Sequence, residues 1–397
     1  EKRLAGFSFR AASDKLVALL CQHDARRRFH RKILVDALQF DGHGIQRATD
    51  ALYSALKLVC PDVEIVYLCS RDRPDVSSVP HRRIVIDPSR RDDEIRATVA
   101  EERPDMIHFP FNGNPPGGLK KVSPQTRIIS TIHDIIPVKI PQVLCWPEAA
   151  VEKFRVEIDT TLRQSDEIFC DSRHTLRVLV ETFGADERRL HCLYFAPMVD
   201  VCGQEEQCDE VRGSFFLYNG GYCRRKGIEL LVENFLKLKR AERLKSTLVM
   251  TGHPWAWDEV IKANLDEGKK KGWILELGYV SDEKLLWLFR HAVAMAYPSL
   301  YEGFGLPPLE AMNLGCPALV ARTSSLPEIC DDAACYLEDR SNSDEFCSAL
   351  LRLETDADYR NELIRRGRIR AAQFSWESTV QAFLSVVESI HEDSNSL

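Results

Sequence analysis

Short apolar runs alternate with longer amphipathic stretches along most of this chain. The short runs have the length of buried strands, and the longer stretches repeat apolar residues with the period of a helix. In the first half, strands are predicted at 31–38, 63–68, 83–87, 105–111, 127–133 and 167–172. Helical patterns such as 45–58 and 148–164 lie between them. This alternation predicts a parallel sheet flanked by helices.

A second series of the same kind follows a polar interruption. Residues 201–214 lack periodicity and are predicted to form a linker. The strands expected after it are 215–221, 247–253, 274–280, 293–299 and 317–322. The pattern therefore predicts an α/β protein with parallel-sheet domains over 31–200 and 211–374. Two such domains would face each other across a cleft, which is a favoured place for ligands.

Composition narrows the class of protein. The 397 residues are 44% hydrophobic and 28% charged, as in ordinary globular proteins, and suffice for two to three domains. The net charge of −7 argues against a general nucleic-acid binder, so no nucleic acid is expected as a partner. No apolar stretch is long enough for a membrane-spanning helix, and the first residues lack the pattern of a secretory signal.

The 13 cysteines are irregularly spaced and include no C-x-x-C pair. Many lie inside apolar strands, where a free cysteine behaves as a small hydrophobic residue. This usage favours a reducing compartment and a cytoplasmic protein.

The first 32 residues form a basic segment, with nine Lys and Arg against three Asp and Glu. Residues 1–30 are therefore set apart as an N-terminal extension. One interpretation of residues 1–32 is peripheral contact with the anionic inner face of the cytoplasmic membrane. The alternatives are a solvated helix or the remnant of a preceding domain.

The segment PSLYEGFGLPPLEAMNLGCP (298–317) carries the most chemistry. A strand ends at Pro298, a glycine-rich loop follows, and a helix is predicted to begin near Pro307. The loop amides and the helix dipole suit an anion, while Glu302 and Glu310 suit hydroxyl groups. Alternatively, Glu310 complements the helix dipole and Glu302 is an exposed loop charge.

Three further segments carry candidate residues. In YNGGYCRRKGIELLVENF (218–235), Arg225 and Lys226 precede a helix and could bind a diphosphate, or form a solvated basic turn. Gly42 and Gly44 follow the first strand, as in a phosphate-approaching turn. His133 ends a strand in TIHDIIPVKIP, where it could position a substrate or be a satisfied loop histidine. Asp356 and Asp358, the single D-x-D, are better explained by helix capping than by a metal site.

Taken in order, these segments resemble a retaining glycosyltransferase of the GT-B fold, family GT4. The similarity covers roughly residues 31–391 and is strongest in NGGYCRRKGIELLVENF, VMTGH, FSWESTVQAFL and the stretch from GYVSDEK to SSLPEI. TIHDIIPVKIP is similar to the subgroup that builds bacterial surface polysaccharides, often with mannose. The resemblance implies two Rossmann-like domains facing a central cleft, with the last helix, over 375–397, crossing back onto the first.

The resemblance also implies a role for each matched residue. Glu302 would hold the donor sugar's hydroxyls, and Glu310 the ribose hydroxyls. Arg225 and Lys226 would neutralise the leaving diphosphate in place of a metal, and His133 would lie near the anomeric carbon. The other donor-binding positions are Gly42, Gly44, Gly221, Val280, Gly303, Phe304, Gly305 and Leu306.

The implied reaction is metal-independent transfer of a hexose to a glycan or lipid-linked glycan, with retention and no cofactor beyond the nucleotide-diphosphate sugar. GDP-mannose is the first candidate donor, and UDP and dTDP sugars are alternatives. A GT-B epimerase or phosphorylase, a non-catalytic nucleotide-sugar binding module and a nicotinamide dehydrogenase are the rival classes. The dehydrogenase is disfavoured because no G-x-G-x-x-G follows the first strand.

Overall fold

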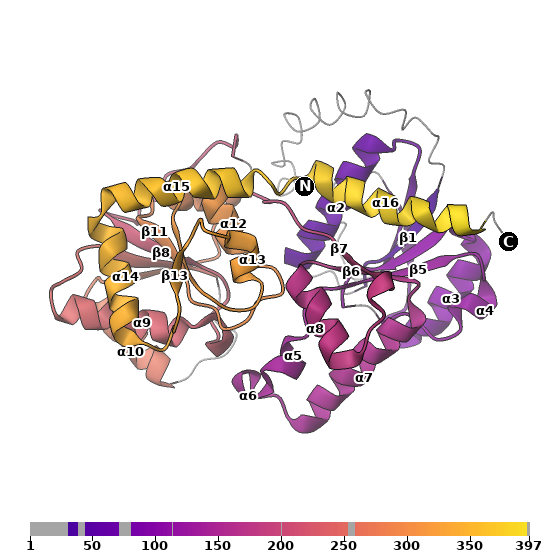
Figure 1. Ribbon diagram of the computed structural model, residues 1–397, viewed down its shortest axis with the longest axis horizontal. Coiled ribbons are helices and arrows are strands. Elements are labelled where there is room, and N and C mark those ends of the chain that lie inside the picture. Colours follow the sequence, from indigo (N-terminus) through magenta and orange to yellow (C-terminus); the bar gives the residue numbers. More distant parts are fainter. Residues whose placement is uncertain are drawn as a thin grey trace. The chain divides into compact units, whose positions relative to one another are not determined.

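The computed structural model describes residues 31–38, 44–70, 81–112, 114–199, 201–252 and 259–394 (Figure 1). The chain divides into two compact units. The first comprises the described residues up to Lys139, Trp146–Met198 and the C-terminal residues from Ser375, and the second comprises Ile140–Cys145 and Val199–Phe374. The extension at 1–30 and Gly42 lie outside the described residues.

The first unit contains a parallel seven-stranded sheet in the order β3-β2-β1-β4-β5-β6-β7. All six strands predicted for this half are confirmed. The seventh was missed because β7 is three residues long and fully buries only one of them. The strands are β1 (Lys32–Asp36), β2 (Glu64–Cys69), β3 (Arg82–Val85), β4 (Met106–Phe109), β5 (Arg127–Ile132), β6 (Glu167–Cys170) and β7 (Leu190–Cys192).

Helices flank this sheet, and one of them comes from the far end of the chain (Figure 1). Helix α16 (Trp376–Ser394) lies along α2 (Gly44–Val59). Its Phe383 ring stacks on Phe169 of β6 with centroids 5.4 Å apart. The other helical segments are η1 (Pro88–Arg90), α3 (Arg91–Glu102), α4 (Leu119–Val122), α5 (Ile136–Lys139), α7 (Glu148–Gln164), α8 (Arg173–Phe183) and η2 (Glu187–Arg189).

The second unit contains a parallel six-stranded sheet in the order β10-β9-β8-β11-β12-β13. Its strands are β8 (Phe215–Asn219), β9 (Thr247–Thr251), β10 (Ile274–Gly278), β11 (Ala294–Tyr297), β12 (Ala318–Ala321) and β13 (Cys335–Leu337). Every residue of β11 and β12 is buried. Such continuous burial is typical of parallel strands with both faces covered. The five predicted strands are confirmed, and the three-residue β13 was missed.

Nine helical segments of this unit are described. They are α6 (Pro141–Leu144), η3 (Arg224–Lys226), α9 (Ile228–Arg240), α10 (Glu259–Lys270), α11 (Asp282–His291), α12 (Leu306–Asn313), α13 (Leu326–Cys330), α14 (Ser343–Thr355) and α15 (Ala357–Ala371). Asp356 accepts a 2.9 Å hydrogen bond from the Tyr359 amide at the start of α15. The capping role predicted for Asp356 is thus confirmed.

In both sheets the strand order reverses in the middle. The reversal lies between β1 and β4 in the first unit and between β8 and β11 in the second. Ligands of open parallel sheets bind outside the carboxyl ends of the strands at such a reversal. The segments that follow β8 and β11 are therefore where a ligand site is expected in the second unit.

Two segments differ from their expected places. Residues 201–214, expected to be a linker, belong to the second unit and pack on α11: Cys208 is buried, and the Glu206 amide donates to the Glu283 carbonyl. Residues 140–145, expected in the first domain, also belong to the second unit, where α6 contacts η3. Local polarity does not reveal such packing, because the contacts join residues far apart in sequence.

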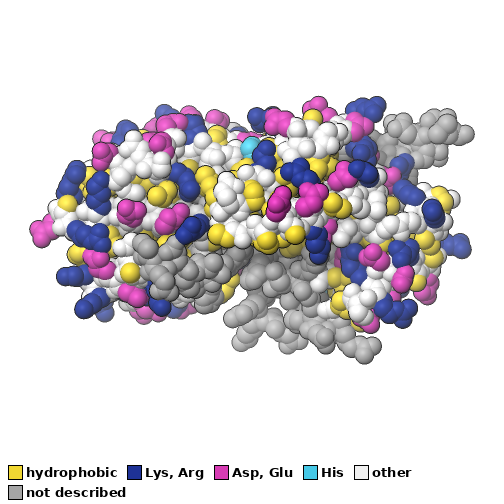
Figure 2. Space-filling model, turned by 90° about the horizontal axis from the view of Figure 1, so that it is seen from below, with side chains coloured by type: hydrophobic (Ala, Val, Ile, Leu, Met, Phe, Trp, Pro, Cys, Tyr) yellow, Lys and Arg dark blue, Asp and Glu magenta, His cyan; other side chains and the backbone are white. Residues whose placement is uncertain are grey.

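One face of the molecule mixes charges of both signs among its described residues. On the face drawn in Figure 2, basic and acidic side chains are interspersed among the coloured residues rather than gathered by sign. Such a surface differs from the single-sign patches that bind nucleic acid. Within the described ranges, no helix combines the length and the apolar character needed to cross a membrane.

Candidate active site

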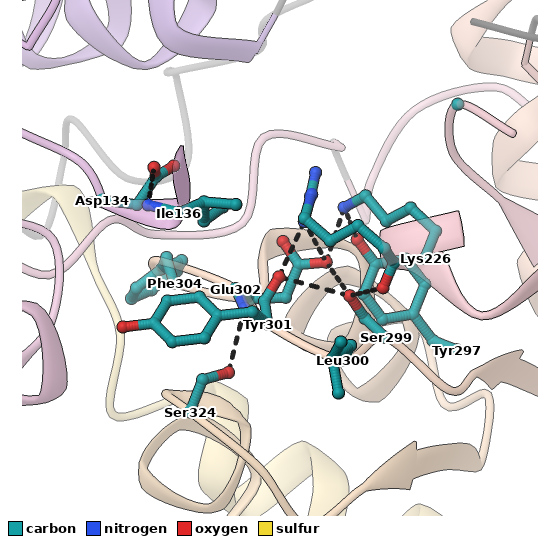
Figure 3. Close-up of polar contacts among 12 residues, drawn as sticks. Asp134, Ile136, Lys226, Tyr297, Ser299, Leu300, Tyr301, Glu302, Phe304 and Ser324 are labelled. Carbon is teal, nitrogen blue, oxygen red and sulfur yellow. Dashed lines mark hydrogen bonds and ion pairs between the residues drawn. The ribbon is translucent and has the colours of Figure 1, made fainter. Parts of the chain in front are cut away.

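Glu302 lies in the loop between β11 and α12, and one of its oxygen atoms contacts three side chains (Figure 3). Its Oε1 is 2.6 Å from Lys226 Nζ, 3.0 Å from Arg225 Nη1 and 2.6 Å from Ser299 Oγ. The glutamate is only 8% exposed. Two cations and a hydroxyl donor thus meet on one buried carboxylate.

The two cations come from η3, the short turn that follows β8. Two hydrogen bonds join this turn to the loop after β11, one between backbone groups and one from a side chain. The Leu300 amide donates to the Arg225 carbonyl at 2.7 Å, and Arg225 Nη1 donates to the Tyr301 carbonyl at 2.7 Å. Because β8 and β11 are neighbours at the strand reversal, these bonds hold the cations beside Glu302.

Gly227 ends η3 in a conformation that favours glycine. Its φ is +69°, and a Cβ atom there would overlap the carbonyl oxygen of Pro298. That oxygen also accepts a 3.0 Å hydrogen bond from Arg340 Nη1. The close approach of the two backbones brings η3 against the loop of Glu302.

We expect Gly227→Ala to destabilise the protein by about 1–3 kcal/mol more than Gly272→Ala. The two glycines share a left-handed conformation, since Gly272 has φ +66°, but a Cβ at Gly272 meets nothing within 4 Å. The difference in unfolding free energy, measured with denaturant, isolates the contact with Pro298. Equal losses in the two variants would contradict the role assigned to this approach.

Charge and burial oppose each other at Glu302. Burial alone raises the pKa of its carboxyl, but the charges of Lys226 and Arg225 and the hydrogen bonds outweigh burial and lower it to about 2. Burial lowers the pKa of Lys226, an effect that the Glu302 charge opposes. The ammonium group also contacts the Tyr297 hydroxyl and lies 4.7 Å from the centroid of that ring.

The cluster has a net charge of +1, since two cations face one carboxylate. The loop continues from Glu302 to Gly305, which has φ +112° and precedes the first turn of α12 at Leu306. A surplus cation beside a helix N-terminus can bind an anion. Diphosphate chemistry fits this arrangement.

The other predicted donor-binding residues are spread over the second unit. Glu310 is buried within α12, eight residues after Glu302. Gly221 follows β8, and its carbonyl accepts a 2.9 Å hydrogen bond from the Tyr218 hydroxyl. Val280 lies between β10 and α11. In the first unit, Gly44 is the first residue of α2.

His133 directly follows β5 in the first unit and is 5% exposed. Its Nδ1 is 2.7 Å from Asp171 Oδ2 and its Nε2 is 2.6 Å from the Pro110 carbonyl oxygen. Its backbone amide donates to Asn112 Oδ1 at 2.9 Å. These contacts match the interpretation of His133 as a loop histidine whose two ring nitrogens both have hydrogen-bond partners in the protein.

Sequence reasoning missed four residues at these sites. Tyr297 and Ser299 flank the end of β11 and contact the Lys226–Glu302 pair, and Gly227 shapes the turn that carries the cations. Asp171 pairs with His133. Asp171 had a signal, because it lies at the end of a predicted strand, as His133 does; the others depend on the pairing of β8 with β11.

Comparison with protein families and curated proteins gives consistent matches. A family model described as Glycosyl transferases group 1 matches residues 209–370. Over 260 residues the chain is 37% identical to O-antigen chain mannosyltransferase B of Escherichia coli, covering 64% of this chain and 68% of that protein. It is 28% identical over 283 residues to the serotype-specific mannosyltransferase WbdA of Escherichia coli, covering 67% of this chain and 34% of that protein.

A solved structure shows the same fold. HepE of Anabaena, in complex with UDP and glucose, superposes with a TM-score of 0.72 at 15% identity, covering 91% of this chain and all of that one. The likeness extends over both sheets, because it covers nearly the whole chain.

Proposed function

Because this chain belongs to the group 1 glycosyl transferases and has the GT-B fold of two parallel-sheet domains, we propose that it transfers a hexose with retention and without a metal ion. The first candidate donor is GDP-mannose, and the acceptor is a glycan or lipid-linked glycan of a surface polysaccharide. The observation that carries this proposal is the buried contact of Lys226 and Arg225 with Glu302 at the strand reversal.

The cation pair does the work that a metal would do on a leaving diphosphate. As the bond from the sugar to the phosphate breaks, negative charge grows on the phosphate oxygens, and Lys226 and Arg225 stabilise it. Fixed charges in a buried site require little reorganisation during the reaction, so their effect exceeds that of ions in water. Both side chains are held in position, since each is hydrogen-bonded to the loop after β11.

Retention follows if the acceptor approaches from the face that the diphosphate leaves. A new bond then forms between the acceptor oxygen and the anomeric carbon, and the acceptor's proton passes to the leaving phosphate. Glu302 and Glu310 hold hydroxyls of the sugar and ribose. The role of His133 near the anomeric carbon stays a prediction, because both of its ring nitrogens contact groups of the protein. A covalent intermediate on a carboxylate is the alternative route to the same stereochemistry.

Mannose is favoured by the relatives, since both E. coli proteins are named mannosyltransferases. The complex of HepE with UDP and glucose supports the alternative of a UDP sugar. We propose that the protein is cytoplasmic and meets its acceptor at the inner face of the cytoplasmic membrane. The basic residues 1–32 would contact the membrane surface. The charge of that segment supports this part of the proposal.

Thermal unfolding with EDTA and a panel of GDP, UDP, ADP and dTDP tests donor class and metal dependence together. A nucleotide at about 100 times its dissociation constant adds roughly 2.7 kcal/mol to the unfolding free energy. We expect GDP to raise the melting temperature most, with no further rise when Mg²⁺ replaces EDTA. Stabilisation by UDP alone would move the donor to the alternative class, and a shift seen only with Mg²⁺ would contradict metal independence.

Stereochemistry and acceptor dependence need a second measurement. Proton NMR of the product formed from GDP-mannose reports the anomeric configuration directly. Retention predicts the α product from the α-linked donor, and a β product would contradict it. A product formed without any acceptor would favour the epimerase class.

A further inference from the structure

Asp171 and His133 lie side by side at the carboxyl edge of the first sheet. Ile132 of β5 is in register with Cys170 of β6, so the residues that follow the two strands are the next neighbours. Their side chains meet at 2.7 Å, from His133 Nδ1 to Asp171 Oδ2. The aspartate is 4% exposed and the histidine 5%.

The partners of the imidazole determine where its protons lie. Nε2 faces the carbonyl oxygen of Pro110 at 2.6 Å, and a carbonyl oxygen only accepts hydrogen bonds, so Nε2 carries a hydrogen. Nδ1 faces a carboxylate, which also accepts, so Nδ1 carries a hydrogen as well. A ring protonated on both nitrogens is an imidazolium cation. The geometry therefore describes a buried ion pair.

The groups packed around the ring agree with this charge. Burial by itself lowers the pKa of His133, but Asp171, the Pro110 carbonyl and the charge of Asp134 outweigh burial and raise it. His108 on β4 lies nearby but does not repel a charged His133, because burial lowers the pKa of His108 to about 3 and keeps that ring neutral. The remaining aromatic neighbour, Phe195, has its centroid 6.0 Å from that of His133.

Asp171 differs from the aspartate at the other end of the same strand. Asp166, directly before β6, accepts a 2.7 Å hydrogen bond from the Ile128 amide and pairs with Lys120 at 2.6 Å. Asp166 therefore anchors backbone. The second oxygen of Asp171, Oδ1, is buried and has no hydrogen-bond partner among the described residues. The hydrogen bond to His133 is thus the contact that the structure shows for the Asp171 carboxylate.

We propose that Asp171 is a positioning residue that keeps His133 doubly protonated and in one ring orientation. Because both N–H groups are then bonded within the protein, to Asp171 and to the Pro110 carbonyl, His133 has no free lone pair and cannot act as a base. The effect expected on turnover rests on the proposed function, whereas the charge of the ring does not. An asparagine at 171 can donate its amide hydrogen to Nδ1, so the ring would keep the hydrogen on Nε2 for the Pro110 carbonyl, lose the one on Nδ1 and become neutral.

The charge of the ring can be measured on the full chain by NMR of the protein labelled with ¹⁵N-histidine. His133→Asn identifies the signal among the 11 histidines. At pH 7.0, half a unit above the ordinary pKa of about 6.5, we expect both nitrogens of His133 to be protonated in the unmodified protein. In Asp171→Asn we expect a neutral ring at the same pH, and in Asp166→Asn, the matched control, an unchanged imidazolium. A neutral His133 in the unmodified protein, or an imidazolium in Asp171→Asn, would overturn the proposal.

Turnover gives a separate readout. We expect Asp171→Asn to lower kcat by about tenfold, the size of losing one charge-assisted hydrogen bond, with an unchanged thermal shift by the nucleoside diphosphate. Asp171→Glu, which keeps the charge, should restore part of kcat and the imidazolium signal. If Asp171→Asn does not fold, the spectrum of the unmodified protein still decides the charge. A failed nucleotide panel with an intact imidazolium would count against the proposed function and not against the ion pair.

Discussion

Replacing Lys226 by methionine is expected to lower turnover about 10²–10³-fold, the loss typical of removing one group that stabilises transition-state charge. Lys226 Nζ is 2.6 Å from Glu302 and lies in a buried cluster, where its charge is poorly screened. Methionine keeps most of the length and the apolar stem of lysine but removes the charge. The protein should stay folded, because Arg225 and Ser299 still contact the remaining carboxylate.

The measurement is steady-state transfer of mannose from GDP-mannose, with the melting temperature recorded in parallel. Lys237→Met is the matched control, since Lys237 is a half-exposed lysine of α9 that also pairs with a carboxylate, Asp344, at 3.3 Å. Its turnover should be unchanged. Near-normal turnover in Lys226→Met would refute the placement of the leaving diphosphate at η3.

Glu302→Gln should have two effects of opposite sign. Turnover should fall by about 10²–10³-fold, because the glutamine amide is uncharged and has one accepting oxygen where the carboxylate has two. Binding of the free nucleoside diphosphate should instead tighten about tenfold or more, since charge-assisted contacts are worth roughly 1.5–3 kcal/mol. The reason is that Lys226 and Arg225 are paired with Glu302 in the free protein. An incoming diphosphate must therefore compete with the Glu302 carboxylate for these two cations.

The charge of Glu302 in this competition should not vary with pH between 5 and 9, whereas the terminal phosphate of GDP changes charge near pH ~6, so affinities are compared at one pH. The pKa of Glu302 is lowered to about 2, so its carboxylate is ionised throughout that range, and its stabilising pairs are lost only as the pH falls below the ordinary value for glutamate towards 2. Calorimetric titration with GDP measures the affinity. Glu338→Gln, at an exposed carboxylate 2.6 Å from Arg322, is the control and should leave the affinity unchanged. Weaker binding of GDP to Glu302→Gln would contradict the competition.

Much of the fold could be predicted because buried parallel strands stand out as short apolar runs. Each strand found beyond the predictions, β7 and β13, has three residues, too few for a pattern. The site could be predicted only in part. Glu302 and Lys226 were each singled out locally, but their contact joins residues 76 apart in sequence and depends on β8 lying beside β11. Strand order is set by packing between distant segments, and no local pattern records it.

The pairing of His133 with Asp171 was hidden for the same reason. Each residue lies at the end of a predicted strand, yet their contact requires β5 and β6 to be neighbours in register. The short α6 is a further case, because its contact with η3 places it in the second unit although its sequence neighbours belong to the first. Periodicity finds elements; it does not assign them to a unit.

The return of α16 to the first unit affects how the protein is made. The ribosome completes all of the second unit, through Phe374, before it begins α16. Until then Tyr53 and Phe169 lack the Phe383 ring that packs against both of them. The second unit can therefore finish folding while the first is still incomplete, and the nascent first unit carries an uncovered apolar strip during that interval. Chaperones that hold such strips during translation would act on the half of the chain that was synthesised first.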